Sequence, residues 1–314
     1  MSNSGPRVSI GLPVYNGELY LREALNSILA QTFEDFELII SDNNSVDRTQ
    51  EICREYAAKD RRISYFRNEK NMGAGWNVNR VFQLSRGEYF KWAAHDDICA
   101  PTLLSRCVEV LDRDSSVALC YSKMSWLDSQ GTSIEKYDVT PPTDSPKPSQ
   151  RFRYLVSVNY PTFPIFGLIR SEILRKTSLF GKYMNADRAL LARLALHGRF
   201  HQIPEYLFFF RMHSEQSTML TSRPDLYYQW WDPENEGRFV FPEWRLLYEY
   251  CRCAREARVK WDERMRCYLV IGRSFPKYAR GMVGDLKRCA ARVFPVLKPV
   301  MKLARKCSRF TRRS

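Results

Sequence analysis

Several features that define other classes of protein are missing from this sequence of 314 residues. No window approaches the roughly 18 uninterrupted apolar residues of a membrane-spanning helix. The stretch from Met1 to Arg7 has no basic segment followed by an apolar one, as a secretory signal has, so we expect the protein to start in the cytosol. The nine cysteines include no Cys-x-x-Cys pair and lie mostly in apolar segments, which predicts reduced, buried thiols.

A net positive charge is also missing from most of the chain, although the whole chain has a net charge of +14. Residues 251–314 hold 19 Lys and Arg against 4 Asp and Glu, whereas residues 1–250 hold 30 against 31. No zinc-finger, RNA-recognition or helix-turn-helix pattern accompanies the basic residues, so we expect no nucleic-acid partner. Interleaved apolar residues such as Trp261, Met265 and Leu269 predict amphipathic helices. These are either solvated faces of helices packed on the rest of the protein or a surface that docks on anionic lipid.

Short apolar or β-branched runs alternate with segments of helical spacing in the first part of the chain. The runs Arg7–Val14, Phe36–Ser41, Ile63–Phe66 and Glu88–Ala93 predict strands. Helical spacing lies between them, for example from Leu21 to Leu29, after the N-cap expected at Ser45 and from Trp76 to Leu84. The alternation predicts parallel βαβ units and therefore an α/β fold, with a mostly parallel, Rossmann-like sheet flanked by helices.

The later part of the chain is more mixed. The predicted elements are a helix from Pro101, a strand Val117–Tyr121, a Pro/Ser-rich loop Thr140–Ser149, a strand Ile165–Ile169, a helix Ala186–Leu196 and a strand Tyr206–Phe210. From about Pro242 the pattern indicates helices broken by Pro276, Pro295 and Pro299.

Polar residues follow three of the predicted parallel strands, whose carboxyl ends should meet in one cleft. They are Pro13–Asn16, Ser41–Asp47 and His95–Asp97. Ser41–Asp47 could be only a turn that leads into a helix, and Asp96–Asp97 only a solvated turn. Two adjacent carboxylates oppose each other's ionisation, but a divalent cation held between them and a phosphate reverses that repulsion.

The order and spacing of these segments resemble the family 2 glycosyltransferases, which bind nucleotide sugars on a fold called GT-A. The matching segments are Pro13–Asn16, Leu25–Thr32, Phe36–Thr49, Asn71–Gly73 with Asn79, Gly87–Asp97, Asn185–Arg188, Gly198, Ile203–Pro204 and Phe210–His213. They cover roughly residues 7–218. The resemblance implies a GT-A catalytic domain over residues 1–225, followed by a basic, aromatic-rich helical extension over residues 226–314.

The resemblance also implies roles for single residues. It places the donor nucleotide against Pro13, Val14, Tyr15, Asp42, Asn71, Asn79 and Asp96, a Mg²⁺ or Mn²⁺ ion on Asp96, Asp97 and His213, and the catalytic base at Asp187. Asp187 could instead be an acidic residue favoured in the first turn of a helix, and His213 an ordinary surface histidine. His197 and His201 have a zinc-like spacing, but Gly198 interrupts the helix that would align them.

The implied activity is inverting, metal-dependent transfer of a sugar from a nucleotide diphosphate, expected to be UDP, to a glycan or lipid-linked acceptor in cell-surface polysaccharide synthesis. Ala94 and Asn43 stand where many members of the family have Asp, so the chain could also be a weak or inactive nucleotide-binding module. A sugar-1-phosphate nucleotidyltransferase would want a Gly-rich phosphate loop with a basic residue, which Leu12–Glu18 does not offer. The lipid-linked acceptor favours a peripheral position at the inner face of the cell membrane.

Overall fold

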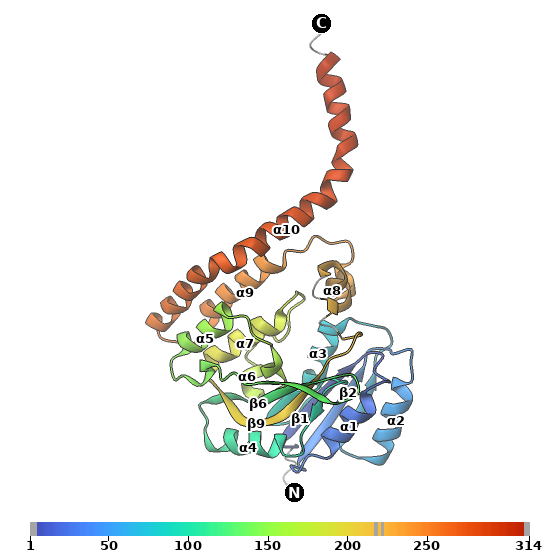
Figure 1. The fold of residues 1–314 in the computed structure, drawn as a ribbon, viewed down its shortest axis with the longest axis vertical. Coiled ribbons are helices and arrows are strands. Elements are labelled where there is room, and N and C mark those ends of the chain that lie inside the picture. Colours follow the sequence, from blue (N-terminus) through green and yellow to red (C-terminus); the bar gives the residue numbers. More distant parts are fainter. Residues whose placement is uncertain (1–4, 217–218, 221–222, 311–314) are drawn as a thin grey trace.

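The structure is a computed structural model that describes residues 5–216, 219–220 and 223–310. Its strands are β1 (Val8–Val14), β2 (Phe36–Asp42), β3 (Ile63–Arg67), β4 (Tyr89–Trp92), β5 (Ile98–Cys99), β6 (Val117–Leu127), β7 (Ser133–Tyr137), β8 (Leu168–Arg170) and β9 (Arg199–Arg211). Figure 1 shows them gathered in one sheet, with helices around it and one long helix extending from it.

The helices follow the predicted alternation. They are α1 (Leu21–Leu29), α2 (Thr49–Lys59), α3 (Ala74–Gln83), α4 (Leu103–Arg113), α5 (Pro148–Ser157), α6 (Ser171–Leu174), α7 (Ala186–His197), α8 (Pro224–Trp231), α9 (Pro242–Glu256) and α10 (Trp261–Phe310). Three short 3-10 helices are η1 (Pro142–Asp144), η2 (Phe163–Phe166) and η4 (Pro233–Asn235).

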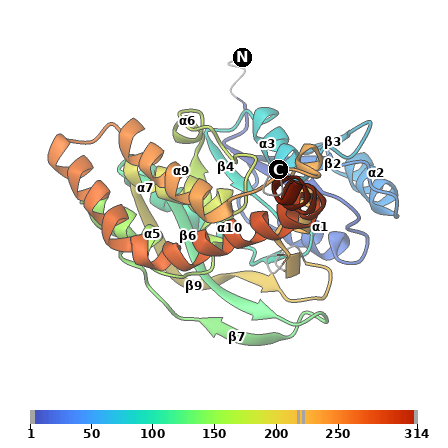
Figure 2. The ribbon, with the colours of Figure 1, turned by 90° about the horizontal axis from the view of Figure 1, so that it is seen from above.

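The sheet has the strand order β3-β2-β1-β4-β8-β6-β9-β5, and β7 pairs with β6 beside this path. β1 is parallel to β2 and β4, β2 to β3, and β6 to β9. β8 is antiparallel to β4 and β6, and β5 and β7 are antiparallel to their neighbours. Six of the nine described strands therefore run one way, which confirms the mostly parallel α/β sheet. Figure 2 shows helices on both sides of it.

Burial on both faces of the sheet explains why the first strands read as continuous apolar runs. All seven residues of β2 are buried. Helix α1 buries Leu21, Ala24, Leu25 and Ile28, which recur at helical spacing on one face. A Cβ at Gly11 of β1 would lie 2.7 Å from side chains of Val81 and Phe90, so α3 packs closely on β1 because that position has no side chain.

Two predicted helix starts are wrong. The residue that precedes α2 is Arg48, and Ser45 instead accepts a hydrogen bond from the Asn16 N–H through Oγ. Helix α4 begins at Leu103, two residues after Pro101. Neither helix has a side-chain cap. The first start was predicted from a cap at Ser45 and the second from the preference of proline for a first helical turn.

The prolines do not break the last helix, contrary to the sequence pattern. Helix α10 continues through Pro276, Pro295 and Pro299. A proline inside a helix removes one backbone hydrogen bond. On either side of Pro276 the helix is held from outside, because Ser274 Oγ lies 2.7 Å from Ser157 Oγ and the Tyr278 hydroxyl donates to the Val156 carbonyl. Tertiary contacts thus override the local signal.

The C-terminal helices share a core with the rest of the chain. The Tyr250 ring of α9 is fully buried and packs edge-on against Phe152 of α5 and Tyr278 of α10, at centroid distances of 6.2 and 6.1 Å. Figure 1 shows α10 lying first along α5 and α9 and then leaving them. The predicted helical extension is therefore present. No helix among the described residues is both long enough and apolar enough to cross a membrane.

Segment α8–η4 packs on the part of the chain that precedes residue 225. The Trp231 indole N–H donates to the Gly181 carbonyl at 2.8 Å. A Cβ at Gly75 would lie 2.6 Å from the same indole nitrogen, and one at Gly73, where φ is +84°, 2.6 Å from Pro233. The boundary between residues 225 and 226 stays a prediction, and close packing crosses it.

Removal of the Phe152 ring tests whether this shared core stabilises the whole chain. We expect Phe152→Ala to lower the free energy of unfolding by about 3–5 kcal/mol, because the ring is fully buried between α5 and α9. Ile134→Ala on β7 is the control, since Ile134 is 60% exposed and its truncation should cost less than about 0.5 kcal/mol. Urea unfolding measures both values, and a similar loss in the two variants would contradict the shared core.

Candidate functional site

The carboxyl ends of β1 and β2 lie side by side. The strand register pairs Val14 with Asp42, and the Asn43 N–H donates to the Val14 carbonyl at 2.8 Å. Pro13 precedes this pair, and Tyr15 follows it with an exposed side chain. Parallel pairing thus brings together four of the residues expected to contact the donor.

The Asp42 carboxylate is buried and already has three hydrogen-bond donors. The Ser45 N–H donates to Oδ1, and the Tyr65 hydroxyl and Arg67 Nη1 donate to Oδ2, each at 2.8 Å. Burial, and then the hydrogen bond to Asp42, raise the pKa of Tyr65, so its hydroxyl remains a donor. A carboxylate has about four acceptor positions, so roughly one is left for a further donor.

Arg67 and Tyr65 were not identified from the sequence. They stand two residues apart on β3, so their side chains share one face of the strand. The register places Arg67 directly opposite Asp42. Alternation along β3 could have found them, had the pairing of β3 with β2 been used.

A network of amide side chains continues from the end of β2. Asn43 Nδ2 donates to Asn71 Oδ1 at 2.8 Å, and the Gly73 N–H donates to the same oxygen at 2.8 Å. Asn43 Oδ1 accepts from Asn68 Nδ2 at 3.0 Å, and Asn77 Nδ2 donates to the Ser41 carbonyl at 2.7 Å. Asn71 is therefore fixed beside the end of β2, close to the turn that starts α3.

Asn79 lies on α3 and holds a different segment. Its Nδ2 donates to the Phe180 carbonyl at 2.8 Å, and its Oδ1 accepts from the Phe180 N–H at 3.1 Å. The amide thus joins α3 to a loop 101 residues further along the chain. A direct contact between Asn79 and the donor stays a prediction.

Asp97 is a buried carboxylate with one unused oxygen. Its Oδ1 accepts from the Arg211 N–H at 3.0 Å, while Oδ2 is buried and has no hydrogen-bond partner among the described residues. Burial, and then the neighbouring charge of Asp96, raise the pKa of Asp97 well above its usual range. An orphaned buried oxygen of this kind is costly unless a ligand uses it.

Asp96 is paired with His213. The distance from Asp96 Oδ2 to His213 Nε2 is 2.9 Å, and the Glu215 N–H donates to His213 Nδ1 at 3.3 Å. Because Nδ1 accepts, Nε2 carries the proton and donates to Asp96. Burial favours the protonated acid, but His95 and this hydrogen bond outweigh it and hold the pKa of Asp96 below its usual range.

Arg211 connects the two carboxylates to three other parts of the chain, and the sequence reasoning gave it no role. Its side chain is fully buried. Nε donates to the Asp96 carbonyl at 3.0 Å, Nη1 to the Ser129 carbonyl at 3.2 Å and Nη2 to Glu23 at 2.6 Å. The guanidinium lies over the Tyr20 ring, 4.7 Å from its centroid. In the sequence, only its position within Phe210–His213, one of the segments that resemble the family, indicates such a role.

Asp187 lies in the first turn of α7 and is half-buried. Its Oδ1 accepts from the Arg188 N–H at 2.8 Å, and Asn185 before the helix has a left-handed backbone with φ of +63°. The Arg188 guanidinium is engaged elsewhere, since it donates to the Tyr160 carbonyl and lies over the Tyr160 ring. Burial, and then the negative charge of Asp187, raise the pKa of Tyr227, which places α8 close to this carboxylate.

Except for Asn79, which holds the Phe180 loop, the expected site residues fall into three groups. Asp42 with residues 13–15 and Asn71 forms the first group, Asp96, Asp97 and His213 form the second, and Asp187 alone is the third. The first two groups border one another, because β1 pairs with both β2 and β4. In the part of the chain that the structure describes, no hydrogen bond or ion pair joins Asp187 to either group. Their convergence on one substrate stays a prediction.

The residues of the second group are compatible with a divalent cation. The described residues contain no ready-made cluster of three or more His, Cys, Asp or Glu ligands. However, Asp97 Oδ2 is unused, and Asp96 Oδ2 and His213 Nε2 are 2.9 Å apart. Neighbouring ligands of an octahedral Mg²⁺ ion are separated by about 3 Å, so these two atoms have a spacing that suits a cation once the His213 proton is on Nδ1. Ala94 contributes no ligand.

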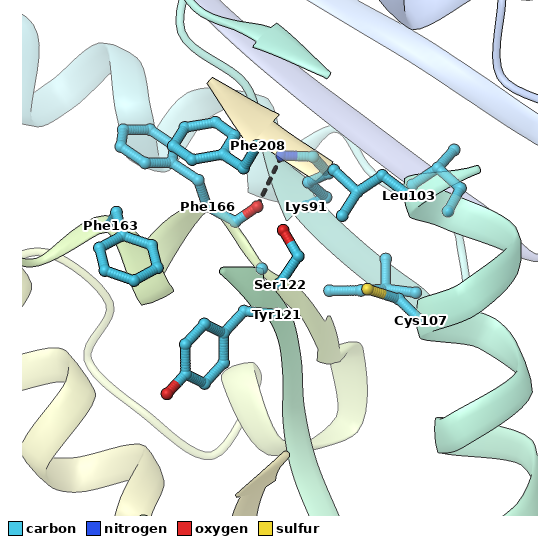
Figure 3. A pocket seen from close by; sticks show the side chains of 11 residues that line it. Lys91, Leu103, Cys107, Tyr121, Ser122, Phe163, Phe166 and Phe208 are labelled. Carbon is cyan, nitrogen blue, oxygen red and sulfur yellow. Dashed lines mark hydrogen bonds between the residues drawn. The ribbon is translucent and has the colours of Figure 1, made fainter. Parts of the chain in front are cut away.

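Two small cavities inside the described part of the protein lie away from these residues. One is bordered by Lys91, Cys107, Tyr121, Ser122 and Phe208, and Figure 3 shows the Lys91 amine directed at the Phe166 carbonyl, to which it donates at 2.6 Å. This cavity and a second one beside Tyr154 each have room for about one water molecule. They are too small for a sugar nucleotide.

Arg211 should stabilise the arrangement of both carboxylates. We expect Arg211→Leu to lower the free energy of unfolding by about 2–4 kcal/mol, because two carbonyl groups and Glu23 lose their partner. Arg61→Leu serves as the control, since Arg61 is exposed and its replacement should have little effect. Equal stability of the two variants in urea unfolding would show that Arg211 does not organise the site.

Comparisons with known proteins agree with this geometry. The model of the family described as glycosyl transferase family 2 matches residues 9–176, more than half of the chain. An uncharacterised glycosyltransferase of Rickettsia typhi is 34% identical over 184 residues, which are 56% of this chain and 54% of that protein. The chain thus matches only about half of the length of this relative.

Solved structures show the same fold. Residues 1–349 of TarS from S. aureus, in complex with UDP, align with a TM-score of 0.62 at 19% identity, over 86% of this chain and 72% of the other. The mannosyltransferase PcManGT from Pyrobaculum calidifontis, in complex with GDP-Man and Mn²⁺, aligns with a TM-score of 0.56 at 15% identity, over 96% and 81% of the two chains. At these identities the likeness concerns the fold alone. The chain belongs to glycosyl transferase family 2 and has the GT-A fold of that family.

Proposed function

We propose that this chain is an inverting, metal-dependent glycosyltransferase that moves a sugar from a nucleotide diphosphate to a hydroxyl group. The observation that carries the proposal is the set Asp96, Asp97 and His213 at the carboxyl edge of the sheet, where one buried carboxylate oxygen has no partner among the described residues. Catalysis of this transfer needs positive charge at the leaving diphosphate, and paired carboxylates are the usual means of holding it.

Residues at the ends of β1 and β2 would bind the nucleotide. Asp42 would accept a hydrogen bond from the base at its remaining lone pair, and Pro13, Val14 and Tyr15 would form the wall along the base. Asn71 is already held at this edge by Asn43. We propose UDP as the nucleotide. Among the fold neighbours, TarS is solved with UDP and PcManGT with GDP-Man, so the fold takes more than one base.

The divalent cation, Mg²⁺ or Mn²⁺, would neutralise charge on the leaving diphosphate when bound. Asp97 Oδ2, Asp96 Oδ2 and His213 Nε2 would hold it, and Asp96 would also reach the ribose. His213 would bind through Nε2 as the tautomer that carries its proton on Nδ1, in place of the hydrogen bond that Nδ1 accepts from the Glu215 N–H. Arg211 donates through Nε to the Asp96 carbonyl and through its backbone N–H to the Asp97 carboxylate, which keeps both residues in place.

Asp187 would act as the catalytic base. It accepts one backbone hydrogen bond, and no ion pair with it is found among the described residues, so a lone pair remains for the proton of the acceptor hydroxyl. The hydroxyl would attack the anomeric carbon from the side opposite the diphosphate, and a single displacement of this kind inverts the configuration. Helix α8, whose Tyr227 feels the charge of Asp187, would then lie on the acceptor side.

The acceptor would be a glycan or a lipid-linked glycan used in cell-surface polysaccharide synthesis. A lipid-linked acceptor accords with a peripheral position at the inner face of the cell membrane and with an anionic membrane surface as a partner of the basic C-terminal region. That region has 19 basic against 4 acidic residues from Cys251 onward.

A second candidate is a GT-A module that binds nucleotides with little or no activity. Two observations favour it: Ala94 cannot act as a metal ligand, and Asp42 is already bonded to Arg67 and Tyr65. Activity under this alternative would be weak because the cation and the base of the nucleotide are held by fewer groups.

Nucleotide titration distinguishes these possibilities. We expect UDP to bind at least about tenfold more tightly with Mn²⁺ than without it, and Asp97→Asn to remove that difference. The same variant should raise the free energy of unfolding of the metal-free protein at pH 7 by at least about 1 kcal/mol. Asp97 is charged above about pH 4 in the unfolded chain, and its raised pKa in the folded protein means that this charge lowers the free energy of unfolding at pH 7. Asn carries no charge, so the replacement removes this loss.

Calorimetric titration gives the first result and urea unfolding the second, with Asp112→Asn as a control, since Asp112 is held by Arg7 and Tyr89 far from this edge. Binding of UDP that is independent of Mn²⁺ would refute the metal-dependent mechanism. A panel of nucleotide sugars tested for slow hydrolysis then identifies the donor.

Asp187→Asn should separate catalysis from donor binding. We expect turnover to fall by at least about a thousandfold because the amide cannot take the proton, while the affinity for UDP with Mn²⁺ changes less than about twofold. Glu172→Gln, on the exposed helix α6, is the control. Donor hydrolysis or transfer measures turnover, and a variant that retains it would assign the base to another residue.

A further inference from the structure

Helix α10 exposes an apolar stripe on its outer side. Six large apolar side chains are exposed there: Trp261 (72%), Met265 (40%), Leu269 (58%), Phe275 (48%), Val283 (51%) and Leu286 (51%). With 100° per residue, these positions fall within about 120° of one another around the helix. Figure 1 shows this part of α10 on the outside of α9 and α5.

The opposite side of the same helix is used for packing. The buried residues on that side are Cys267, Ile271, Tyr278 and Met282. The Trp244 indole of α9 donates to the Met282 carbonyl at 3.2 Å, and Ser274 contacts Ser157 of α5. Packing on the rest of the protein therefore accounts for the inner face, but it leaves the outer stripe uncovered in the part of the chain that the structure describes.

Four basic residues border the stripe at intervals of seven. Arg266, Arg273, Arg280 and Lys287 are all exposed, and the constant spacing aligns them along one edge of the helix. Arg266 lies 3.8 Å from Glu263, whereas the other three form no ion pair with the described residues.

Acidic residues are scarce on this surface. From residue 261 to 291 the sequence contains three acids, and two of them are in the first turn of the helix: Asp262, which is exposed, and Glu263, which accepts from the Ser149 N–H. The third is Asp285. Its side chain is buried, accepts from the Glu243 N–H and pairs with Arg288. The exposed surface of this part of α10 is therefore apolar along its centre and positive along its edge.

We propose that this outer face of α10, from Trp261 to Leu286, is a docking surface for an anionic lipid bilayer. Apolar and aromatic side chains can enter the boundary between headgroups and acyl chains, while Arg and Lys remain beside lipid phosphates. Nucleic acid would attract the charges but would leave six exposed apolar side chains without a function. At 1.5 Å per residue the stripe is about 40 Å long, so the helix lies in the plane of the membrane.

This inference makes the membrane partner of the proposed function specific, but it does not depend on glycosyl transfer. Binding to lipid is measured without donor or acceptor. A protein that binds vesicles and no nucleotide would support the docking surface and refute the proposed activity, and the reverse result would do the opposite.

Sedimentation of the full-length protein with vesicles tests the surface. We expect binding to vesicles that contain about one third phosphatidylglycerol to be at least tenfold stronger than to phosphatidylcholine alone. Arg273→Glu with Arg280→Glu should reduce it more than about tenfold, since each basic residue near such a surface contributes about fivefold. Trp261→Ser with Leu269→Ser should reduce it by a similar factor.

The control is Ile134→Ser on β7, which removes an apolar side chain that is 60% exposed on another element. It should bind as the unchanged protein does. All the replaced side chains are exposed, so we expect each variant to keep its fold. Urea unfolding of each variant checks this.

Three results would overturn the proposal. They are equal binding to neutral and anionic vesicles, binding that the apolar replacements leave unchanged, and stronger binding to a DNA duplex than to anionic vesicles. The last result, with loss only in the Arg273→Glu and Arg280→Glu variant, would assign the surface to nucleic acid.

Discussion

The hydrogen bonds of Arg211 hold Asp96 and Asp97 at the edge of the sheet. Strand β9 is inserted between β6 and β5, and its last residue reaches Asp96 and Asp97, more than 110 positions earlier in the sequence. A buried guanidinium is costly to desolvate, and its carbonyl, carboxylate and ring contacts offset that cost. The next residues of the chain carry His213 to Asp96. The parallel pairing of β6 with β9 is thus the condition for the site, since a shift in register would separate the histidine from the carboxylate.

The same contacts leave Asp97 poorly compensated. Its carboxylate receives one backbone hydrogen bond and is adjacent to Asp96, and its second oxygen is buried without a partner among the described residues. A chain selected only for stability would place an apolar or amide side chain here. The unfavourable group lies beside a second carboxylate, Asp96, and the imidazole of His213. That combination favours a ligand of positive charge, and it is the physical reason for assigning a cation to this edge of the sheet.

Local sequence signals were sufficient for β1 to β4, α1 and α3, because the strands are short apolar or β-branched runs and the helices have apolar residues at helical spacing. The predicted strand Ile165–Ile169 overlaps β8 only at Leu168 and Ile169, because Phe163–Phe166 is the 3-10 helix η2. The antiparallel place of β8 between β4 and β6 could not be predicted, since three residues carry no pairing information. The position of Asp42, Asp96 and Asp97 at one edge of the sheet could be predicted, because the carboxyl ends of neighbouring parallel strands meet there. Their partners could not, as Arg67 and Arg211 read as ordinary surface cations until the pairing of β3 and β9 is known. In the same way, Pro276 signals a helix end that only the contacts of Ser274 and Tyr278 overcome.

The two departures from the family pattern have different consequences. At position 43 the amide both donates to Asn71 and accepts from Asn68. A carboxylate could not donate to Asn71. The amide of Asn43 therefore makes both hydrogen bonds, and no polar group of this network loses its partner through the departure from Asp. At position 94 Ala provides no carboxylate, and among the described residues a cation would depend on Asp96, Asp97 and His213, together with the diphosphate and water. Mg²⁺ and Mn²⁺ tolerate such a sphere because they retain several waters when bound to few carboxylates. Affinity for the cation should therefore depend strongly on the nucleotide, since the diphosphate supplies ligands that the protein lacks.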